Sequence, residues 1–420
     1  MGSVTSTSGE PGRTAQPSGP GEVLELTVTG VAHGGWCVAR DTGGRVVFVR
    51  HTLPGERVRA QVTDATTSFA RAEAIEVLQG SPDRVEPRCP HAHPGGCGGC
   101  DWQHASLAAQ RRLKAEVVKD QLRRIAGLDR DVTVEPVPGD EDGLGWRTRV
   151  RFTVGPDGTA GLLAHRSHDV VDVGDCPIAH PLVRVPAVTG RRWEATSVEV
   201  VVSPAAGERA VLTTPAETEP GPLHQHAAGR SWRVSPSAFW QVHPGAADTL
   251  TEAVLDTLRP RPGEVALDLF CGAGLFTGAL AARVGPEGAV IGVDSDRIAV
   301  RDARHNLRGT PWARVHSGDV ARVLARGGWP RPGLAVLDPP RTGASRRVIE
   351  RLLVPHVAGH RRPGPRSGLR RVAYVSCDPA TLARDIAVFA EFGWRLGALR
   401  AFDTFPMTHH VECVAALTPG

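Results

Sequence analysis

Short runs of alternating apolar and polar residues dominate the first part of the chain. Four such runs are 23–28, 45–49, 56–62 and 70–77. Turns rich in Gly, Asp, Thr and Pro separate them, and about five strands in so short a region predict a small OB-like β-barrel over 22–80. Barrels of this size often bind RNA, and a packing module without a ligand is the alternative. Residues 1–21 are rich in Ser, Gly, Thr and Pro and are expected to form a disordered tail.

The pattern changes in the region 81–234. Residues 82–101 lack periodicity and are rich in Pro, Gly, Cys and His, which predicts a loop that something other than an apolar core organises. Residues 105–126 follow a helical period. Their apolar stripe comprises Leu107, Leu113, Val117, Leu122 and Ile125, and a predicted solvated face carries Arg111, Arg112, Lys114, Arg123 and Arg124. The segments that follow read as strands with Pro/Gly turns, so a central β-rich domain is expected.

From residue 235 to 420, helical periods alternate with short apolar runs. The apolar runs predict strands at 265–269, 290–293, 334–337, 372–376 and 411–417. The helical segments predict helices near 246–258, after Leu275, and near 345–354 and 380–392. This alternation is typical of a doubly wound α/β domain. A run rich in Arg, Pro and Gly at 359–371 predicts a surface loop.

Composition narrows the class of protein. The 420 residues leave room for two to four domains. The net charge is +4, and arginine supplies almost all of the positive charge. No run of eighteen apolar residues and no secretory signal is evident, which predicts a cytoplasmic protein without a membrane span. In a reducing compartment the eight cysteines are expected to serve as metal ligands or catalytic thiols rather than disulfides. A monomer is expected.

A glycine-containing loop follows the first strand of the α/β domain. Asp268 ends that strand, and Phe270-Cys-Gly272-Ala-Gly274 leads into a helix. The spacing differs from the dinucleotide and P-loop patterns. The next strand ends at Asp294, where an acid typically accepts hydrogen bonds from ribose hydroxyls. Together these features look like the S-adenosylmethionine site of class I methyltransferases.

A thiol and a carboxylate follow later strands of the same domain. Cys377 lies just after an apolar strand, where a starting helix would favour a thiolate, and Glu412 lies at the start of the last strand. Addition of a thiolate to carbon 6 of uracil makes carbon 5 nucleophilic, and a base must then remove the carbon 5 proton. The alternative for Cys377 is a buried apolar role. Asp338-Pro-Pro-Arg341 should neighbour the cofactor, and similar motifs serve enzymes that methylate exocyclic amines.

Two further patterns indicate ligands. Cys89, Cys97, Cys100 and Cys176 suit zinc or an iron–sulfur cluster with a structural role, and unliganded cysteines are the alternative. Period two places Arg147, Arg149 and Arg151 on one face of a strand. Because three crowded guanidinium groups repel one another, an RNA phosphate is expected to neutralise them.

These motifs resemble those of the RNA uracil-5-methyltransferases that carry an N-terminal TRAM domain and a 4Fe–4S cluster. The resemblance runs from about residue 22 to the C-terminus. It implies that Cys377 is the nucleophile and Glu412 the base, that the four cysteines hold the cluster, and that the helix 105–126 packs on the catalytic domain. The cofactor contacts that it implies are Gln241, Phe270, Gly272, Gly274, Asp294, Asp319 and Asp338. Asp294, Leu275, His243 and Met407 depart from the commonest residues at their positions.

The sequence therefore predicts an S-adenosylmethionine-dependent enzyme that forms 5-methyluridine in a flipped-out loop nucleotide. The resemblance favours 23S ribosomal RNA over transfer RNA. One alternative is a base-amino methyltransferase, in which Cys377→Ala would stay active. A second is an RNA-binding protein with a degenerate methyltransferase domain, and a third is an iron–sulfur redox protein.

Overall fold

The computed structural model describes residues 19–139, 141–354 and 368–420. The tail predicted for 1–21 and the loop predicted for 359–371 lie largely outside these described residues. The chain divides into two compact units, Met1–Arg84 and Val85–Gly420. No helix in the described ranges is long and apolar enough to cross a membrane.

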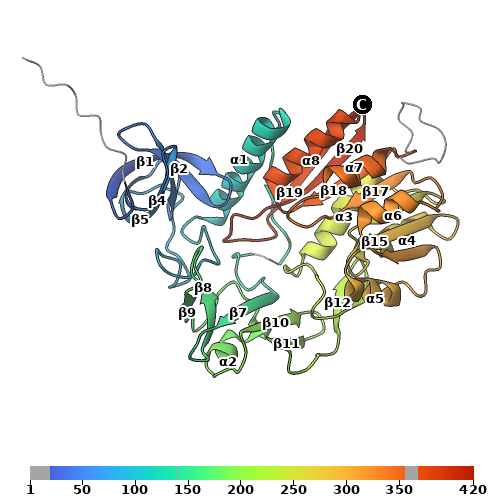
Figure 1. Ribbon diagram of the computed structural model, residues 1–420, viewed down its shortest axis with the longest axis horizontal. Helices are drawn as coiled ribbons and strands as arrows, with labels where there is room; N and C mark the ends of the chain where they lie inside the picture. The colour runs from blue at the N-terminus through green and yellow to red at the C-terminus, as the bar shows by residue number, and fades with distance from the viewer. Residues whose placement is uncertain (1–18, 140, 355–367) are drawn as a thin grey trace, which may run out of the picture. The chain divides into compact units, whose positions relative to one another are not determined.

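The first unit is a closed five-stranded barrel (Figure 1). Its strands are β1 (Val23–Ala32), β2 (Trp36–Arg40), β3 (Val46–Arg50), β4 (Arg57–Ala65) and β5 (Phe69–Gln79). Strand β4 alternates as predicted, because Val58, Ala60 and Val62 are buried while Arg57 and Arg59 are exposed. The sequence pattern predicted the barrel correctly but did not locate β2, whose buried Trp36 and Cys37 interrupt the alternation.

The second unit begins with the cysteine-containing loop and α1 (Leu107–Ala126). Gly127 ends α1 in a left-handed conformation (φ 67°). A five-stranded sheet follows, with the order β11-β10-β7-β8-β9. Its strands are β7 (Arg149–Val154), β8 (Ala160–Leu163), β9 (Val170–Val171), β10 (Ser197–Ser203) and β11 (Glu208–Thr214). A short 3-10 turn (Pro181–Val183), α2 (Val185–Thr189) and the hairpin β12 (Leu223–Ala227) and β13 (Arg230–Val234) complete this region.

The largest sheet has eight strands in the order β16-β15-β14-β17-β18-β20-β19-β6. Their bounds are β14 (Val265–Leu269), β15 (Ala289–Asp294), β16 (Ala313–Ser317), β17 (Leu334–Leu337), β18 (Arg371–Ser376), β19 (Trp394–Phe402), β20 (Glu412–Pro419) and β6 (Val134–Glu135). The strands from β16 to β18 are parallel, and β20 runs antiparallel between β18 and β19. The doubly wound prediction is therefore correct, although β16 and β19 were not predicted.

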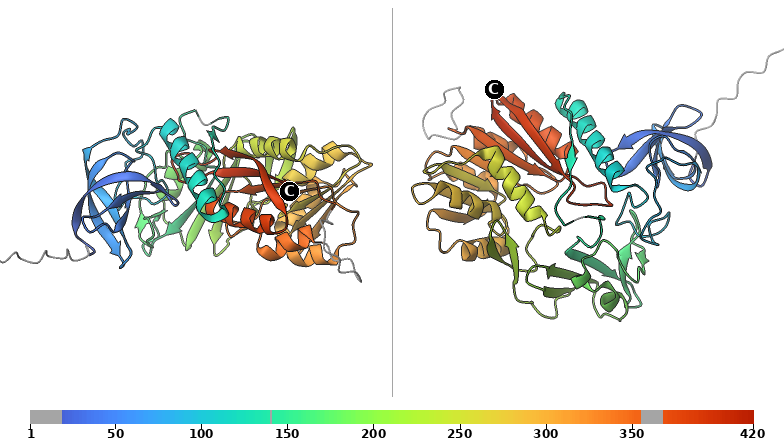
Figure 2. Two further views of the ribbon diagram at one scale, coloured as in Figure 1. Left: turned by 90° about the horizontal axis from the view of Figure 1, so that it is seen from above. Right: turned by 180° about the vertical axis from the view of Figure 1, so that it is seen from behind.

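Helices cover both faces of this sheet, which explains why its central strands are apolar throughout. The helices are α3 (Ala246–Leu258), α4 (Leu275–Val284), α5 (Arg297–Asn306), α6 (Val320–Arg326), α7 (Arg346–Leu353) and α8 (Pro379–Glu391). Helices α3 and α4 belong to one apolar core, and α6, α7 and α8 belong to the other. Helix α1 also contributes to the second core and packs against α8 (Figures 1 and 2).

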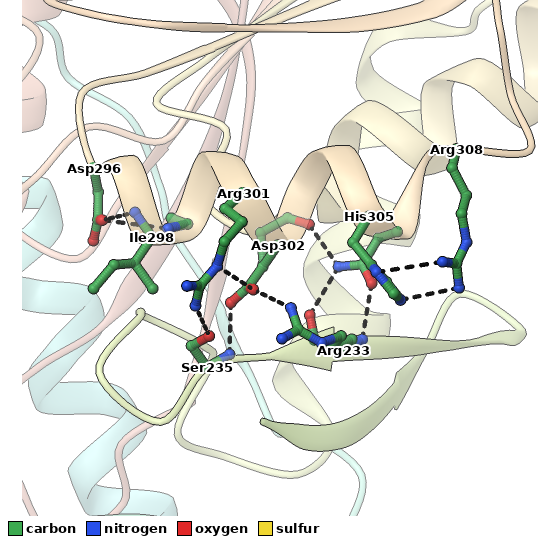
Figure 3. Close-up of polar contacts among 11 residues, drawn as sticks. Arg233, Ser235, Asp296, Ile298, Arg301, Asp302, His305 and Arg308 are labelled. Atoms are coloured by element: carbon green, nitrogen blue, oxygen red, sulfur yellow. Dashed lines mark hydrogen bonds and ion pairs between the residues drawn. The ribbon is translucent and has the colours of Figure 1, made fainter. Parts of the chain in front are cut away.

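A buried carboxylate joins α5 to the end of β13 (Figure 3). Asp302 is fully buried and accepts hydrogen bonds from Arg233 Nη1 and from the backbone N–H of Ser235, both at 2.6 Å. Arg301 Nη2 donates to Ser235 Oγ at 3.0 Å. Because charge-assisted bonds in a buried setting have narrow geometry, these contacts fix the segment that leads to Gln241.

Candidate active site

One cavity of about 890 Å³ opens where the parallel strands β14, β15, β17 and β18 end. In a doubly wound sheet the carboxyl ends of the strands are the usual place for a ligand. Most of the predicted site residues line this cavity, namely Arg147, Arg149, Arg151, Gln241, Phe270, Gly272, Asp294, Asp338, Cys377 and Glu412. The fold thus brings together residues that are up to 265 positions apart, from Arg147 to Glu412 (412 minus 147).

The loop after β14 turns tightly around a carboxylate. Phe270 and Gly272 have positive φ values of 65° and 52°, and the Gly272 N–H donates to Asp294 Oδ2 at 2.8 Å. A side chain on Gly272 would meet no atom within 4 Å, whereas one on Gly274 would press against Ala303 at 3.2 Å. Gly272 therefore leaves open space at the cavity, and Gly274 permits the close packing of α4 on α5.

Two predicted cofactor residues do not line the cavity in the described structure. Gly274 (φ 93°) is the residue at which α4 begins. Asp319 is exposed, and its Oδ1 accepts the N–H of Arg322 at 2.9 Å, which caps α6. Their roles in cofactor binding remain predictions from the resemblance alone.

Burial raises the pKa of two carboxyl groups near the loop after β14. Burial raises the pKa of Asp268 to about 7, and Thr277 Oγ1 donates to Asp268 Oδ2 at 2.6 Å. Burial and the nearby charge of Asp294 raise the pKa of Asp338 to about 7 as well. Of these two acids Asp338 lines the cavity, and a cation beside it would favour its ionised form.

Cys377 and Glu412 face each other across two neighbouring strands. Ser376 of β18 pairs with Cys413 of β20 in an antiparallel register. One further step along this register sets Cys377 opposite Glu412. A thiol and a carboxylate that are separated by 35 positions (412 minus 377) are therefore neighbours on the cavity wall.

The thiol does not have the lowered pKa that its place before α8 suggested. Burial and the charge of Glu412 raise the pKa of Cys377 to about 12, and the Arg341 guanidinium opposes this rise. The N-terminus of α8 is already capped, because Asp378 Oδ1 accepts the N–H of Thr381 at 2.8 Å. Burial and the charge of Asp338 raise the pKa of Glu412 well above its usual range, again against the effect of Arg341.

Arg341 and two histidines complete the wall. The sequence indicated Arg341 only as the end of the Asp338-Pro-Pro motif and gave the two histidines no role. Arg341 Nη2 donates to His410 Nε2 at 3.2 Å. His409 Nδ1 lies 2.6 Å from Asp101 Oδ2, in a segment far away in sequence. Phe239 also lines the cavity with 59% of its surface exposed. Arg341 and His410 lie within motifs that the sequence displays, so these motifs could have suggested them.

The three arginines of the predicted phosphate-binding face have different partners. Arg147 Nε donates to the carbonyl oxygen of Arg149 at 3.1 Å. Arg149 forms two bonds to the Glu199 carboxylate, at 2.9 and 3.1 Å, and also donates to the carbonyl oxygens of Pro236 and Ala238. An internal carboxylate therefore neutralises Arg149, and no RNA phosphate is needed for that purpose. Arg151 is exposed, and its guanidinium donates a long hydrogen bond, at 3.4 Å, to Ser197 Oγ.

The four cysteines Cys89, Cys97, Cys100 and Cys176 line a second, smaller cavity. Gln103 Nε2 donates to Cys100 Sγ at 3.5 Å, and the Gly99 N–H donates to Cys97 Sγ at 3.4 Å. Burial and the charges of the other three thiols raise the pKa of Cys100. Within the described residues no group of three or more His, Cys, Asp or Glu side chains is arranged to hold a metal ion.

Three family models match parts of the chain. A TRAM domain matches residues 17–75, a methyltransferase domain matches 260–322, and a tRNA (uracil-5-)-methyltransferase model matches 335–419. The last match spans Asp338, Cys377 and Glu412. The order of the matches agrees with a barrel followed by a doubly wound catalytic domain.

Relatives match over nearly the whole chain. An uncharacterized RNA methyltransferase of Streptomyces avermitilis is 46% identical over 95% of this chain and 99% of its own length. The 23S rRNA (uracil(1939)-C(5))-methyltransferase RlmD of Methylococcus capsulatus is 31% identical over 94% of this chain and 97% of its own length. The solved tRNA (uracil-54, C5)-methyltransferase of Pyrococcus abyssi shares the fold, with a TM-score of 0.67 at 20% identity over 94% and 99% of the two chains. This chain therefore belongs to the RNA (uracil-5-)-methyltransferase family.

Proposed function

We propose that this protein uses S-adenosylmethionine to methylate carbon 5 of a uridine in structured RNA, through a covalent bond between Cys377 and carbon 6. The observation that carries the proposal is the placement of Cys377 opposite Glu412 in the wall of the cavity that also contains the glycine loop. Methylation of an exocyclic amine would need neither group. The reaction in the names of the relatives agrees with this chemistry.

The cofactor would lie against Gln241, Phe270, Gly272, Asp294 and Asp338, all of which line the cavity. When bound, it supplies a methyl group as an electrophile. Its sulfonium is a cation, and a cation beside buried carboxyl groups favours their ionised form. The raised pKa of Asp338 therefore makes this acid a good partner for a positive ligand.

The residues of the chain would perform the remaining chemistry on the uracil ring. The Cys377 thiolate adds to carbon 6, and the electron pair of the ring double bond moves toward carbon 5 and the carbonyl oxygen. Carbon 5 then gains the methyl group. Glu412 removes the carbon 5 proton, the pair in that bond restores the double bond, and the carbon 6–sulfur bond breaks to return the thiolate.

Arg341 is the cation that this scheme needs. Its guanidinium opposes the rise in pKa of both Cys377 and Glu412. A positive charge at this place stabilises the thiolate before the addition and the enolate oxygen that forms afterwards. Without Arg341, two groups of high pKa would both have to ionise in a desolvated cavity.

Ribosomal RNA is the proposed substrate class, because two relatives with a stated target, both about a third identical to this chain, are named as 23S rRNA methyltransferases. The uridine must leave its stack to present both faces of the ring to Cys377 and the cofactor. Arg147 and Arg151 at the cavity, together with the TRAM barrel, would contact RNA phosphates.

A 4Fe–4S cluster is the proposed ligand of the four cysteines. A single zinc ion would draw four thiolates toward one point, whereas a cluster binds each thiolate at a different iron and so needs sulfurs around a volume. Cys89, Cys97, Cys100 and Cys176 line one cavity, and the resemblance to family members that carry a cluster favours the second case. The N–H bonds to Cys97 and Cys100 are those that thiolate ligands of a cluster accept.

The test is a covalent trap. The Glu412→Gln variant, incubated with cofactor and a ribosomal RNA fragment, should accumulate a protein–RNA band on a denaturing gel, because the final elimination needs a base. The Glu412→Gln/Cys377→Ser variant should give no band. The Glu412→Gln/Cys271→Ala variant, which removes the other thiol that lines the cavity, should keep it.

Mass mapping of 5-methyluridine in ribosomal and transfer RNA, from cells with and without the gene, identifies the substrate. A Cys377→Ala enzyme that still transfers methyl groups would refute the covalent mechanism and favour amine methylation. RNA binding without any transfer would instead indicate a degenerate catalytic domain.

A further inference from the structure

The segment after the third cysteine holds the loop that leads into Glu412. This loop spans 403–411 between β19 and β20. The N–H groups of Asp101 and Trp102 both donate to the carbonyl oxygen of Met407, each at 3.0 Å. Met407 has a positive φ of 66°, a conformation that a non-glycine side chain adopts only where its surroundings impose it.

The Asp101 carboxylate makes the second attachment. Asp101 is 8% exposed, and its Oδ2 accepts the backbone N–H of His409 at 3.1 Å and lies 2.6 Å from His409 Nδ1. One oxygen thus orients both the main chain and the ring of His409. A carboxylate that accepts two bonds in a buried place fixes its partners more firmly than a neutral group does.

The contacts continue from His409 to the candidate catalytic residues. The His409 and His410 rings lie 4.1 Å apart between centroids. His410 Nε2 accepts a hydrogen bond from Arg341, and the Arg341 charge acts on Cys377 and Glu412. A continuous series of contacts therefore runs from the residue beside Cys100 to the site where chemistry is proposed.

We propose that Asp101 is a positioning residue that couples the cysteine site to the active site, by holding the His409–His410 pair and, through it, Arg341. The inference rests on the proposed roles of Cys377 and Glu412. Because Asp101 follows Cys100 directly, a group that orders the four cysteines also orders this carboxylate. The loop would then adopt its catalytic arrangement only when the cysteine loop is intact.

The backbone amide of His409 gives a direct measure, because Asp101 is the acceptor of its hydrogen bond. We expect Asp101→Asn, in the full chain purified anaerobically, to raise hydrogen exchange at this amide by about tenfold or more, from the loss of one charge-assisted bond. Iron content and the cysteine-site absorbance should stay unchanged. The kcat for methylation should fall while the KM for the cofactor stays constant, and exchange at amides outside the loop 403–411 should not change, whereas a merely destabilising change would raise exchange throughout the unit.

Asp175→Asn is the matched control. Like Asp101, Asp175 lies directly beside one of the four cysteines, Cys176. The Asp175 carboxylate, however, accepts a hydrogen bond from the backbone N–H of Cys176, at 2.8 Å. Exchange at His409 should not change in this variant. Equal effects of the two variants, or an unaltered His409 amide in Asp101→Asn, would overturn the proposal.

A second variant guards against a folding defect in the first. His409→Gln removes the same ring contact from the opposite side, and the two changes together should accelerate exchange no more than one alone. Simple addition of the two effects would contradict the proposed contact. The exchange measurement needs no RNA, so it stands even if the chain proves to methylate a different base.

Discussion

The chain contains two lysines, and replacement by methionine should destabilise the protein at one of them and leave its stability unchanged at the other. Lys114 is fully buried in α1, and its Nζ lies 2.5 Å from Asp403 Oδ1 and donates to the Phe405 carbonyl at 2.9 Å. Lys119, five positions further along, has 43% of its side chain exposed, and its partners Asp129 and Asp131 are exposed. The two residues therefore separate a buried ion pair from a solvated one.

The size of the stability loss in Lys114→Met depends on the charge that this change leaves unpaired. Asp403 stays fully buried, with Arg111 at 3.9 Å as the remaining cation. At an effective dielectric constant of about 20, the attraction across 2.5 Å is about 7 kcal/mol and across 3.9 Å about 4 kcal/mol. Arg111 attracts Asp403 before and after the change, so the loss comes from the Lys114 attraction alone. Because a buried methionine carries no charge to desolvate, part of that loss is offset, and the net loss should be about 3 kcal/mol, the lower end for breaking a buried pair.

Thermal unfolding of the two variants tests this reasoning. Lys114→Met should lower Tm by about 5 °C, and Lys119→Met should leave it unchanged, since exposed pairs contribute little. The double variant Lys114→Met/Asp403→Leu should recover most of the loss, because neither member of the buried pair remains, and Arg111, which also loses Asp403, is partly exposed. Equal Tm values for the two single variants would refute the argument, as would a double variant that is no more stable than Lys114→Met.

Two further predictions concern ionisation and RNA binding. Burial raises the pKa of Asp268 to about 7, so the folded state binds more protons than the unfolded state between about pH 4 and 7. The free energy of unfolding should therefore fall as pH rises through this window. In urea unfolding Asp268→Asn should reduce that slope, and parallel profiles would contradict it. Arg151→Ala should weaken RNA binding, and in a salt titration it should lower the slope of log affinity against log salt concentration by about 1. Arg149→Ala, which breaks the Glu199 pair, should mainly lower Tm. Identical RNA affinities for Arg151→Ala and wild type would refute the role of Arg151 in RNA binding.

Local patterns in the sequence were sufficient for most of the architecture. The strict alternation in β4 and the apolar strands β14, β15, β17 and β18 are consequences of which faces meet water, and this depends on neighbours a few residues away. Strand β19 escaped notice because its burial is irregular, with a bulge between Leu396 and Leu399. The types of chemical group at Cys377 and Glu412 could likewise be recognised from the motifs around them.

Only the tertiary structure decided how individual polar side chains are used. The helical pattern placed Lys114 on a solvated face, but it is buried because Asp403, 289 residues away, supplies its counter-charge. Arg149 was assigned to a phosphate, yet Glu199 of a neighbouring strand binds it. The raised pKa of Cys377 depends on burial and on a carboxylate that another strand presents. Periodicity reports on hydrophobic burial, which is local, whereas the state of a charged group depends on the charges and solvent that distant segments bring to it.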